Sequence, residues 1–184
     1  MEGFPIKPSL FRPKTMSNLR APTPRSCVQT PWRDQCSGWT HTEINCTTAY
    51  NSGFEFIPLV DGFITQLAGF FHGSKQVRLY CPNGNILAEI QLNAETHWCA
   101  HQITAVPLKQ QRCYTIAVES PPGPMSVCYG IGLGQLPFAA QDIVISRALY
   151  GLGSASPQHV LCGQVWGQVD IGFIPSVALT QLTL

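Results

Sequence analysis

Three residues of types that commonly bind zinc alternate along one segment of the sequence: His97, Cys99 and His101. Alternate side chains of a β-strand point to the same face, so these three would line one side of a strand. Cys81 or Cys113 from a neighbouring strand could then complete a tetrahedral set of ligands. The alternative is that Cys99 and His101 face the core, because structural zinc sites usually draw paired ligands from short turns. We favour this alternative and predict that the protein uses no metal and no cofactor.

No pattern in the sequence specifies catalysis. A nucleophilic cysteine needs a histidine within hydrogen-bonding distance, whereas residues two apart on a strand lie about 6.5 Å apart. Cys99 therefore does not pair with His97 or His101 on sequence grounds. The carboxylates show no paired spacing, and for Asp170 we prefer hydrogen bonds from a sheet face or edge to a loop. We predict that the protein is not an enzyme.

The large aromatic residues indicate a second kind of chemistry, because sugar rings stack on aromatic faces. The alternative is that these rings pack in the core or on a sheet surface, and we favour packing. The residues considered for stacking on a glycan are Tyr80, Trp98, Tyr150 and Trp166.

The composition restricts the function classes. The chain has 184 residues, of which 45% are hydrophobic and 11% are charged, and its formal net charge is +1. This excludes a charge-repelled disordered chain and argues against nucleic-acid binding through overall basicity. No stretch reads as a membrane span, which needs about 20 apolar residues, and the start of the sequence lacks the apolar region of a secretory signal. We therefore favour free, mostly buried thiols for the eight cysteines, and the alternative is disulfides if the chain reaches an oxidising compartment by another route.

Residues 1–50 read as an extended, Pro-rich and basic arm. Each proline removes a backbone donor and keeps the preceding residue extended. The arm also contains apolar residues, which a purely solvated linker does not need. Such residues either anchor the arm on a neighbouring subunit or pack against the arm's own domain, and the sequence leaves both open. The predicted partner-binding residues are Phe4, Ile6, Leu10, Phe11, Arg12, Leu19, Arg20, Trp32 and Trp39.

From residue 51 to residue 184 the chain reads as an antiparallel β-sandwich or jelly roll. Short runs of β-type residues are separated by turn signals, of which Pro82-Asn83-Gly84-Asn85 is the strongest. No long stretch has the period of a helix. The predicted strands are 54–60, 63–71, 76–81, 86–92, 98–105, 113–119, 126–131, 143–149 and 160–174.

An ordered series of motifs runs through residues 54–174. They are Gly62 to Phe70, Gly84 to Ala88, Trp98 to Ile103, Val106-Pro107, Tyr114 to Ala117 and Trp166 to Phe173. In this order they resemble a bacterial β-sandwich family of unknown function, which occurs beside cadherin-like and immunoglobulin-like modules in surface and secreted proteins. The arm lies outside the resemblance, and the cysteines are not part of the pattern. The resemblance implies a binding or spacer module.

Low charge, abundant glycine and proline, and an arm with apolar anchors predict a non-enzymatic structural protein. We predict a subunit of a larger assembly, such as a virion accessory, cement or tail protein, or a surface filament component. Its partners would be other protein subunits, as a homo-oligomer or in many copies, with neither a membrane span nor nucleic acid. The alternative is a carbohydrate-binding module on a surface. The location is left open, with a virion or the cell surface favoured.

Overall fold

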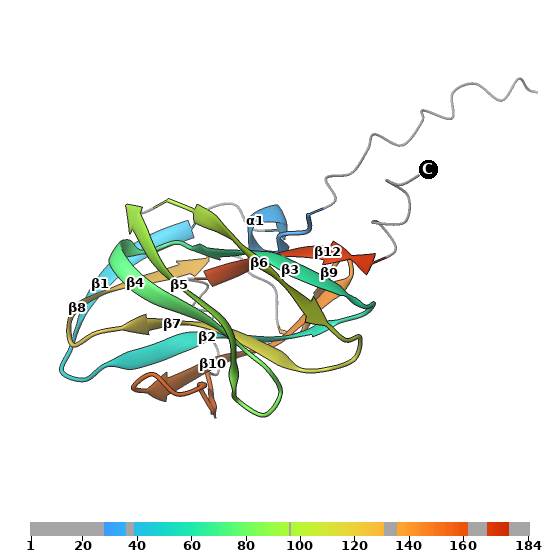
Figure 1. Ribbon diagram of the computed structural model, residues 1–184. Coiled ribbons are helices and arrows are strands. Elements are labelled where there is room, and N and C mark those ends of the chain that lie inside the picture. Colours follow the sequence, from blue (N-terminus) through green and yellow to red (C-terminus); the bar gives the residue numbers. More distant parts are fainter. Residues whose placement is uncertain (1–27, 36–38, 96, 131–135, 162–168, 177–184) are drawn as a thin grey trace, which may run out of the picture.

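A computed structural model describes residues 28–35, 39–95, 97–130, 136–161 and 169–176 (Figure 1). Most of these residues form antiparallel strands, which confirms the predicted all-β sandwich. The seven-stranded sheet has the order β11-β10-β2-β7-β4-β5, and β9 also pairs with β10. Its strands are β2 (Tyr50–Pro58), β4 (His72–Tyr80), β5 (Ile86–Glu95), β7 (Tyr114–Ser120), β9 (Phe138–Ala140), β10 (Ile143–Leu152) and β11 (His159–Val160).

A three-stranded sheet in the order β12-β3-β6 packs over the seven-stranded sheet. A third pair, β1 with β8, forms a two-stranded sheet, and the short helix α1 lies next to β12. No described helix is long and apolar enough to cross a membrane. The bounds of these elements are α1 (Pro31–Gln35), β1 (Trp39–Cys46), β3 (Gly62–Gly69), β6 (Cys99–Leu108), β8 (Gly123–Gly130) and β12 (Val169–Pro175).

The core lies between the inner faces of the two larger sheets. Alternation along β2 directs Phe54 and Phe56 inward, where Phe54 is paired in register with Ile116 of β7. From the other layer, Leu67 of β3 and Ile171 of β12 reach the same cluster. All five side chains are buried. Because apolar residues recur at every second position of these strands, each sheet presents an apolar inner face, and the two faces pack together.

Residues 28–35 close one flank of the sandwich. Gln29 pairs with Phe173 at the edge of β12 through two backbone hydrogen bonds of 2.7 and 2.9 Å. The Trp32 ring has 0% exposure and packs edge-on against Phe54 and Phe138, at centroid distances of 5.2 and 5.0 Å. We call this side, where β12 faces β9 and β10, the closed flank.

Asp170 of β12 holds α1 in place. Its carboxylate accepts hydrogen bonds from the backbone N–H groups of Trp32, Arg33 and Ile171. The Nε of Arg33 donates a further bond of 3.0 Å to the same group. Complete burial raises the pKa of Asp170 to about 6, even though Arg33 and the N–H groups lower it. Asp170 therefore lies in a sheet, as expected, but the expected bonds to a loop are wrong, because its partners Trp32 and Arg33 belong to the helix α1.

The structure divides the predicted arm into two parts. Residues 28–50 contribute α1, β1 and the start of β2 to the fold. The prediction that Trp32 contacts a partner is wrong, because its ring is enclosed by the protein's own core. Trp39 lies in β1, and its side chain is outside the described part of the structure. The other predicted anchors also lie outside the described residues: Phe4, Ile6, Leu10, Phe11, Arg12, Leu19 and Arg20.

Candidate functional site: a groove on the open flank

The flank opposite α1 is formed by the edges of β5 and β6, which belong to different sheets (Figure 1). Each strand is ten residues long. Within the described chain, β5 pairs with β4 and β6 pairs with β3, and neither strand has a partner on its other edge. Natural proteins usually shorten, charge or cover such edges. We call this side the open flank.

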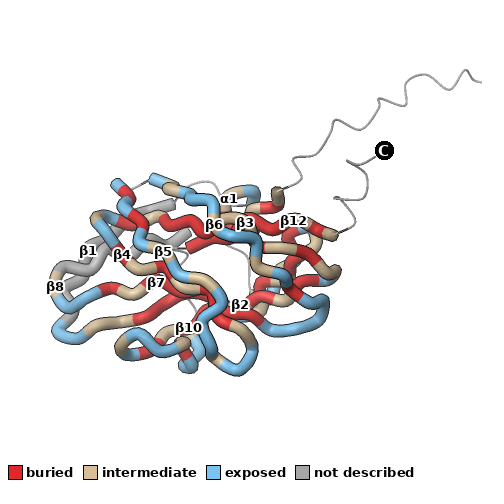
Figure 2. Tube along the Cα trace, viewed as in Figure 1, coloured by how far each residue is buried: buried red, intermediate tan, exposed pale blue. Residues whose placement is uncertain are grey.

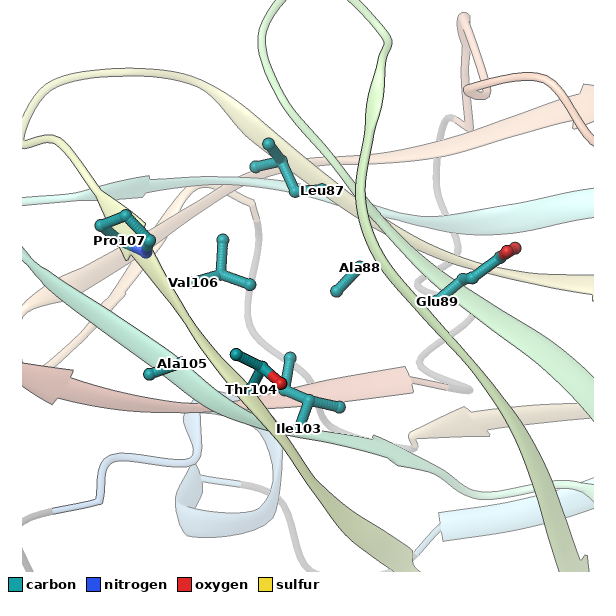
Figure 3. Close-up of a pocket in the computed structure, with 8 residues that line it drawn as sticks. All are labelled: Leu87, Ala88, Glu89, Ile103, Thr104, Ala105, Val106 and Pro107. Carbon is teal, nitrogen blue, oxygen red and sulfur yellow. The ribbon is translucent and has the colours of Figure 1, made fainter.

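A groove of about 650 Å³ lies between the two edges. Figure 3 shows the side chains of Leu87, Val106 and Ile103 around this space, whereas the carboxylate of Glu89 points away from it. The lining is mainly apolar. Its residues are Leu87, Ala88 and Glu89 of β5, and Ile103, Thr104, Ala105, Val106 and Pro107 of β6.

The local structure of the two strands explains why the groove stays open. Apolar residues at the start of β5 remain accessible, with Ile86 49% and Leu87 39% exposed, whereas Leu92 farther along is buried. In β6 the register with β3 shifts between the pairs Ile64–Val106 and Gln66–Gln102. Such a bulge bends the strand locally. Figure 2 shows exposed residues along much of both strands.

The charge of the open flank is one-sided. Strand β5 carries Glu89 and Glu95, and neither β5 nor β6 contains a lysine or arginine. Glu89 accepts a bond of 3.2 Å from Arg78 of β4, which also pairs with Glu119. The charged residues of the two edge strands are therefore acidic, but the Glu89 carboxylate is paired with Arg78 and the groove itself is lined mainly by apolar side chains.

The three zinc-type residues do not form a site with the cysteines considered as partners. His97 is exposed, and its Nδ1 lies 3.0 Å from the Glu95 carbonyl oxygen. Cys99 is half-buried and pairs in register with Gly69 at the start of β6, while His101 is exposed. Among the described residues, no group of three or more histidine, cysteine or acidic side chains is placed to hold a metal.

The described cysteines are free, but they are less buried than the sequence led us to expect. Cys113 is exposed, and Cys81 and Cys99 are half-buried. Partial desolvation and the nearby charge of Glu55 raise the pKa of the Cys113 thiol, which disfavours its thiolate form. The other five cysteine side chains, those of Cys27, Cys36, Cys46, Cys128 and Cys162, lie outside the described part of the structure.

The aromatic residues that were considered for glycan stacking and are described, Tyr80, Trp98 and Tyr150, do not form one platform. Tyr80 is buried, so that assignment is wrong: its ring is not accessible, and its hydroxyl donates to the Ser154 carbonyl in the loop after β10. Trp98 is half-buried and packs edge-on against Phe70. Tyr150 is half-buried beside the His159 ring at 5.3 Å. Trp166 lies outside the described residues.

Comparison with family models, with curated proteins and with solved structures finds no match to this chain. Residue geometry alone therefore guides the functional inference, and the resemblance to the bacterial β-sandwich family stays a prediction. The groove is a feature that the sequence did not reveal. The alternation of Ile86, Ala88, Ile90 and Leu92 predicts a buried face, and it carries no signal that β5 forms a sheet edge.

Proposed function

We propose that the protein is a non-enzymatic interaction module that acts as a subunit of a larger assembly. The groove on the open flank receives residues 1–27 of a neighbouring copy. The observation that carries this proposal is an apolar groove of about 650 Å³ between two strand edges that have no second partner in the described chain. Whether the assembly is a virion or a surface filament stays a prediction.

The closed flank supports this choice of occupant, because there the chain fills an equivalent gap between the sheets. Gln29 extends the edge of β12 by backbone pairing, and Trp32 inserts between the layers. An extended segment with a large apolar anchor is therefore an occupant that the fold already accommodates. Addition of such a segment to a free sheet edge is a common mode of peptide recognition.

Residues 1–27 have the composition that this mode requires. Phe4 and Ile6 alternate, so an extended backbone would direct both side chains to one face, and Leu10 and Phe11 follow. This part of the chain contains five basic residues and one acidic residue. The apolar residues of this segment match the mainly apolar lining of the groove.

The origin of the arm favours a neighbouring copy. Residue 28 follows the arm directly, and Gln29 is fixed at β12, on the closed flank. An extended segment of this length spans up to roughly 90 Å. An arm that leaves the closed flank of one copy and enters the open flank of the next makes a head-to-tail contact, which repeats from copy to copy into a ring or filament.

The test compares the masses of variants of the full chain in solution by light scattering. Leu87→Glu places a charge in the groove, and we expect it to shift an oligomeric protein toward the monomer. Leu152→Glu is the matched control, because Leu152 is 65% exposed and lies outside the groove. A chain lacking residues 1–27 should behave like Leu87→Glu.

Two outcomes contradict the proposal. One is a full chain that is monomeric at every concentration, with an arm that is as sensitive to protease as a free peptide. The other is an oligomer that Leu87→Glu and Leu152→Glu weaken equally, because the contact would then not involve the groove. Circular dichroism of each variant confirms that the sandwich is folded before masses are compared.

A further inference from the structure

A second concave site lies on the outer face of the seven-stranded sheet and shares no lining residue with the groove. Its volume is about 250 Å³. The floor comes from adjacent strands, since Glu55 of β2 pairs in register with Arg147 of β10 on one side and with Thr115 of β7 on the other. The walls include Asn83 from the turn after β4 and Gln158 from the loop after β10. We call this site the polar pocket.

The charges in the polar pocket cancel. Arg147 donates two hydrogen bonds of 3.0 and 2.8 Å to the Glu55 carboxylate, and Ser146 adds a third of 2.6 Å. Burial raises the pKa of Glu55, but the bonds from Arg147 and Ser146 outweigh this effect and hold the pKa below its usual value. The ionised carboxylate and the guanidinium are the charged groups of the lining.

Both walls are fixed by hydrogen bonds within the protein. The Tyr80 hydroxyl donates a hydrogen bond of 3.0 Å to the Ser154 carbonyl, and the Asn51 amide donates one to the Ala155 carbonyl. These bonds hold the loop after β10 against the sheet. The opposite turn is held by the backbone bond from Gly84 to Cys81, at 2.9 Å. The pocket is therefore formed before any ligand enters, which reduces the entropic cost of binding.

Several polar groups of the pocket have no partner within the described chain. Thr115 is 9% exposed, and its hydroxyl makes no hydrogen bond to any described residue. One terminal nitrogen of Arg147 and the amide nitrogen of Asn83 have no acceptor among the described residues. The Gln158 amide oxygen likewise has no donor there. Such groups favour a ligand that both donates and accepts hydrogen bonds.

We infer that the polar pocket binds a neutral, polyhydroxylated ligand, one sugar residue of a glycan. Sugar hydroxyls can meet the unpartnered donors and acceptors together, and a lining without net charge does not select an anion. The volume lies just below the range of about 300–1,000 Å³ typical of drug-sized ligands, which suits a single ring.

The test titrates the isotope-labelled full chain with the methyl glycosides of glucose, galactose, mannose and N-acetylglucosamine, and follows its backbone amides by NMR. We expect at least one sugar to cause saturable shifts around Thr115 and Arg147, with a dissociation constant on the order of 1 mM. Thr115→Val removes the unpartnered hydroxyl at nearly constant volume. It should weaken binding about fivefold, the factor for one hydrogen bond of about 1 kcal/mol.

Matched variants keep the test independent of folding and of the proposed assembly. Thr104→Val makes the same chemical change in the groove and should leave sugar affinity unchanged. Leu87→Glu should also bind sugar with unchanged affinity. The sugar titration therefore tests the polar pocket independently of the proposed assembly through the groove. If Thr115→Val does not fold, Gln158→Ala on the exposed loop replaces it and should weaken binding in the same direction.

Three results would overturn the inference. The first is the absence of saturable shifts with all four glycosides. The second is an unchanged affinity in both Thr115→Val and Gln158→Ala. The third is tighter binding of inorganic phosphate than of any glycoside, because Arg147 would then act as an anion site despite its pairing with Glu55.

Discussion

On both flanks of this sandwich the gap between two sheet edges has to be covered, and the two flanks differ in whether the described chain covers it. On both, the edge of the three-stranded sheet faces an edge region of the larger sheet. The closed flank is filled by the chain itself, with Trp32 buried and Asp170 holding the backbone of α1. The open flank leaves Ile86 and Leu87 accessible beside an apolar groove. Among the described residues, an extended segment with an apolar anchor lies on the closed flank and none lies on the open flank.

The largest effect should follow from emptying the closed flank. Trp32→Ala removes a fully buried ring that contacts Phe54 and Phe138. We expect the free energy of unfolding to fall by about 3–5 kcal/mol, the usual cost of an aromatic-to-alanine change in a core. Denaturant unfolding measures this loss. A loss below about 1 kcal/mol, as at an exposed site, would mean that the segment does not close the flank in solution.

The next effect tests the polar half of the closed flank. Asp170→Asn turns an acceptor oxygen into an N–H₂ donor and leaves the donors of Arg33 and α1 facing another donor. We expect a loss of about 3 kcal/mol at neutral pH, because breaking a buried pair leaves an uncompensated charge. Chemical unfolding of Asp170→Asn is compared with that of Asp34→Asn, which changes an exposed acid of α1 in the same way. The comparison separates the loss of a buried carboxylate from the loss of an exposed one. Equal small losses would contradict the prediction.

The pH dependence of stability should reveal Asp170 in the unmodified protein. Its pKa is about 6 in the folded state and near 3.8 in the unfolded state. Because the folded pKa is the higher one, the contribution of Asp170 is most favourable below pH 3.8. It declines as the pH rises to about 6 and then stays constant, a change of up to roughly 3 kcal/mol. Subtracting the pH profile of Asp170→Asn isolates this contribution, and identical profiles would contradict it.

The smallest effect belongs to the open flank. Leu87→Ala should reduce the stability of a chain lacking residues 1–27 by about 1 kcal/mol or less, because the side chain is already 39% exposed. In the full chain at high concentration the loss should be larger, since an occupied groove buries Leu87 further. Thermal unfolding of both chains at several concentrations measures the difference between the two losses of stability. Equal losses of stability in the two chains would mean that the arm does not contact Leu87.

The period of two predicted most strands, because it is a local property of the chain. It located the strands around Phe54, Ile116 and Ile143, whose neighbours alternate or run apolar. It missed β1, whose sequence WTHTEINC is mostly polar and lies in a Pro-rich region. It also placed one strand over 160–174, where the structure has β11 and β12 at the two ends of that range.

The sites depend on contacts that no local pattern encodes. Trp32 and Asp170 are 138 positions apart in the sequence. The sequence around Trp32 therefore does not distinguish a residue that binds a partner from a residue that packs in the protein's own core. Tyr80 is buried, and its hydroxyl bonds to a loop residue 74 positions later in the sequence. The polar pocket likewise joins Glu55, Thr115 and Arg147, and their alignment follows from strand order alone.

The same separation of 138 positions has a consequence for the newly made chain. Trp32 leaves the ribosome well before Asp170 and Phe173, which hold its segment in place and follow it by more than 130 positions of the sequence. At about 5–20 residues per second, the indole waits roughly 7–30 s without its binding site. The segment that contains Trp32 therefore docks only after β12 has been made, and a chaperone that recognises exposed aromatic side chains would find Trp32 during that interval.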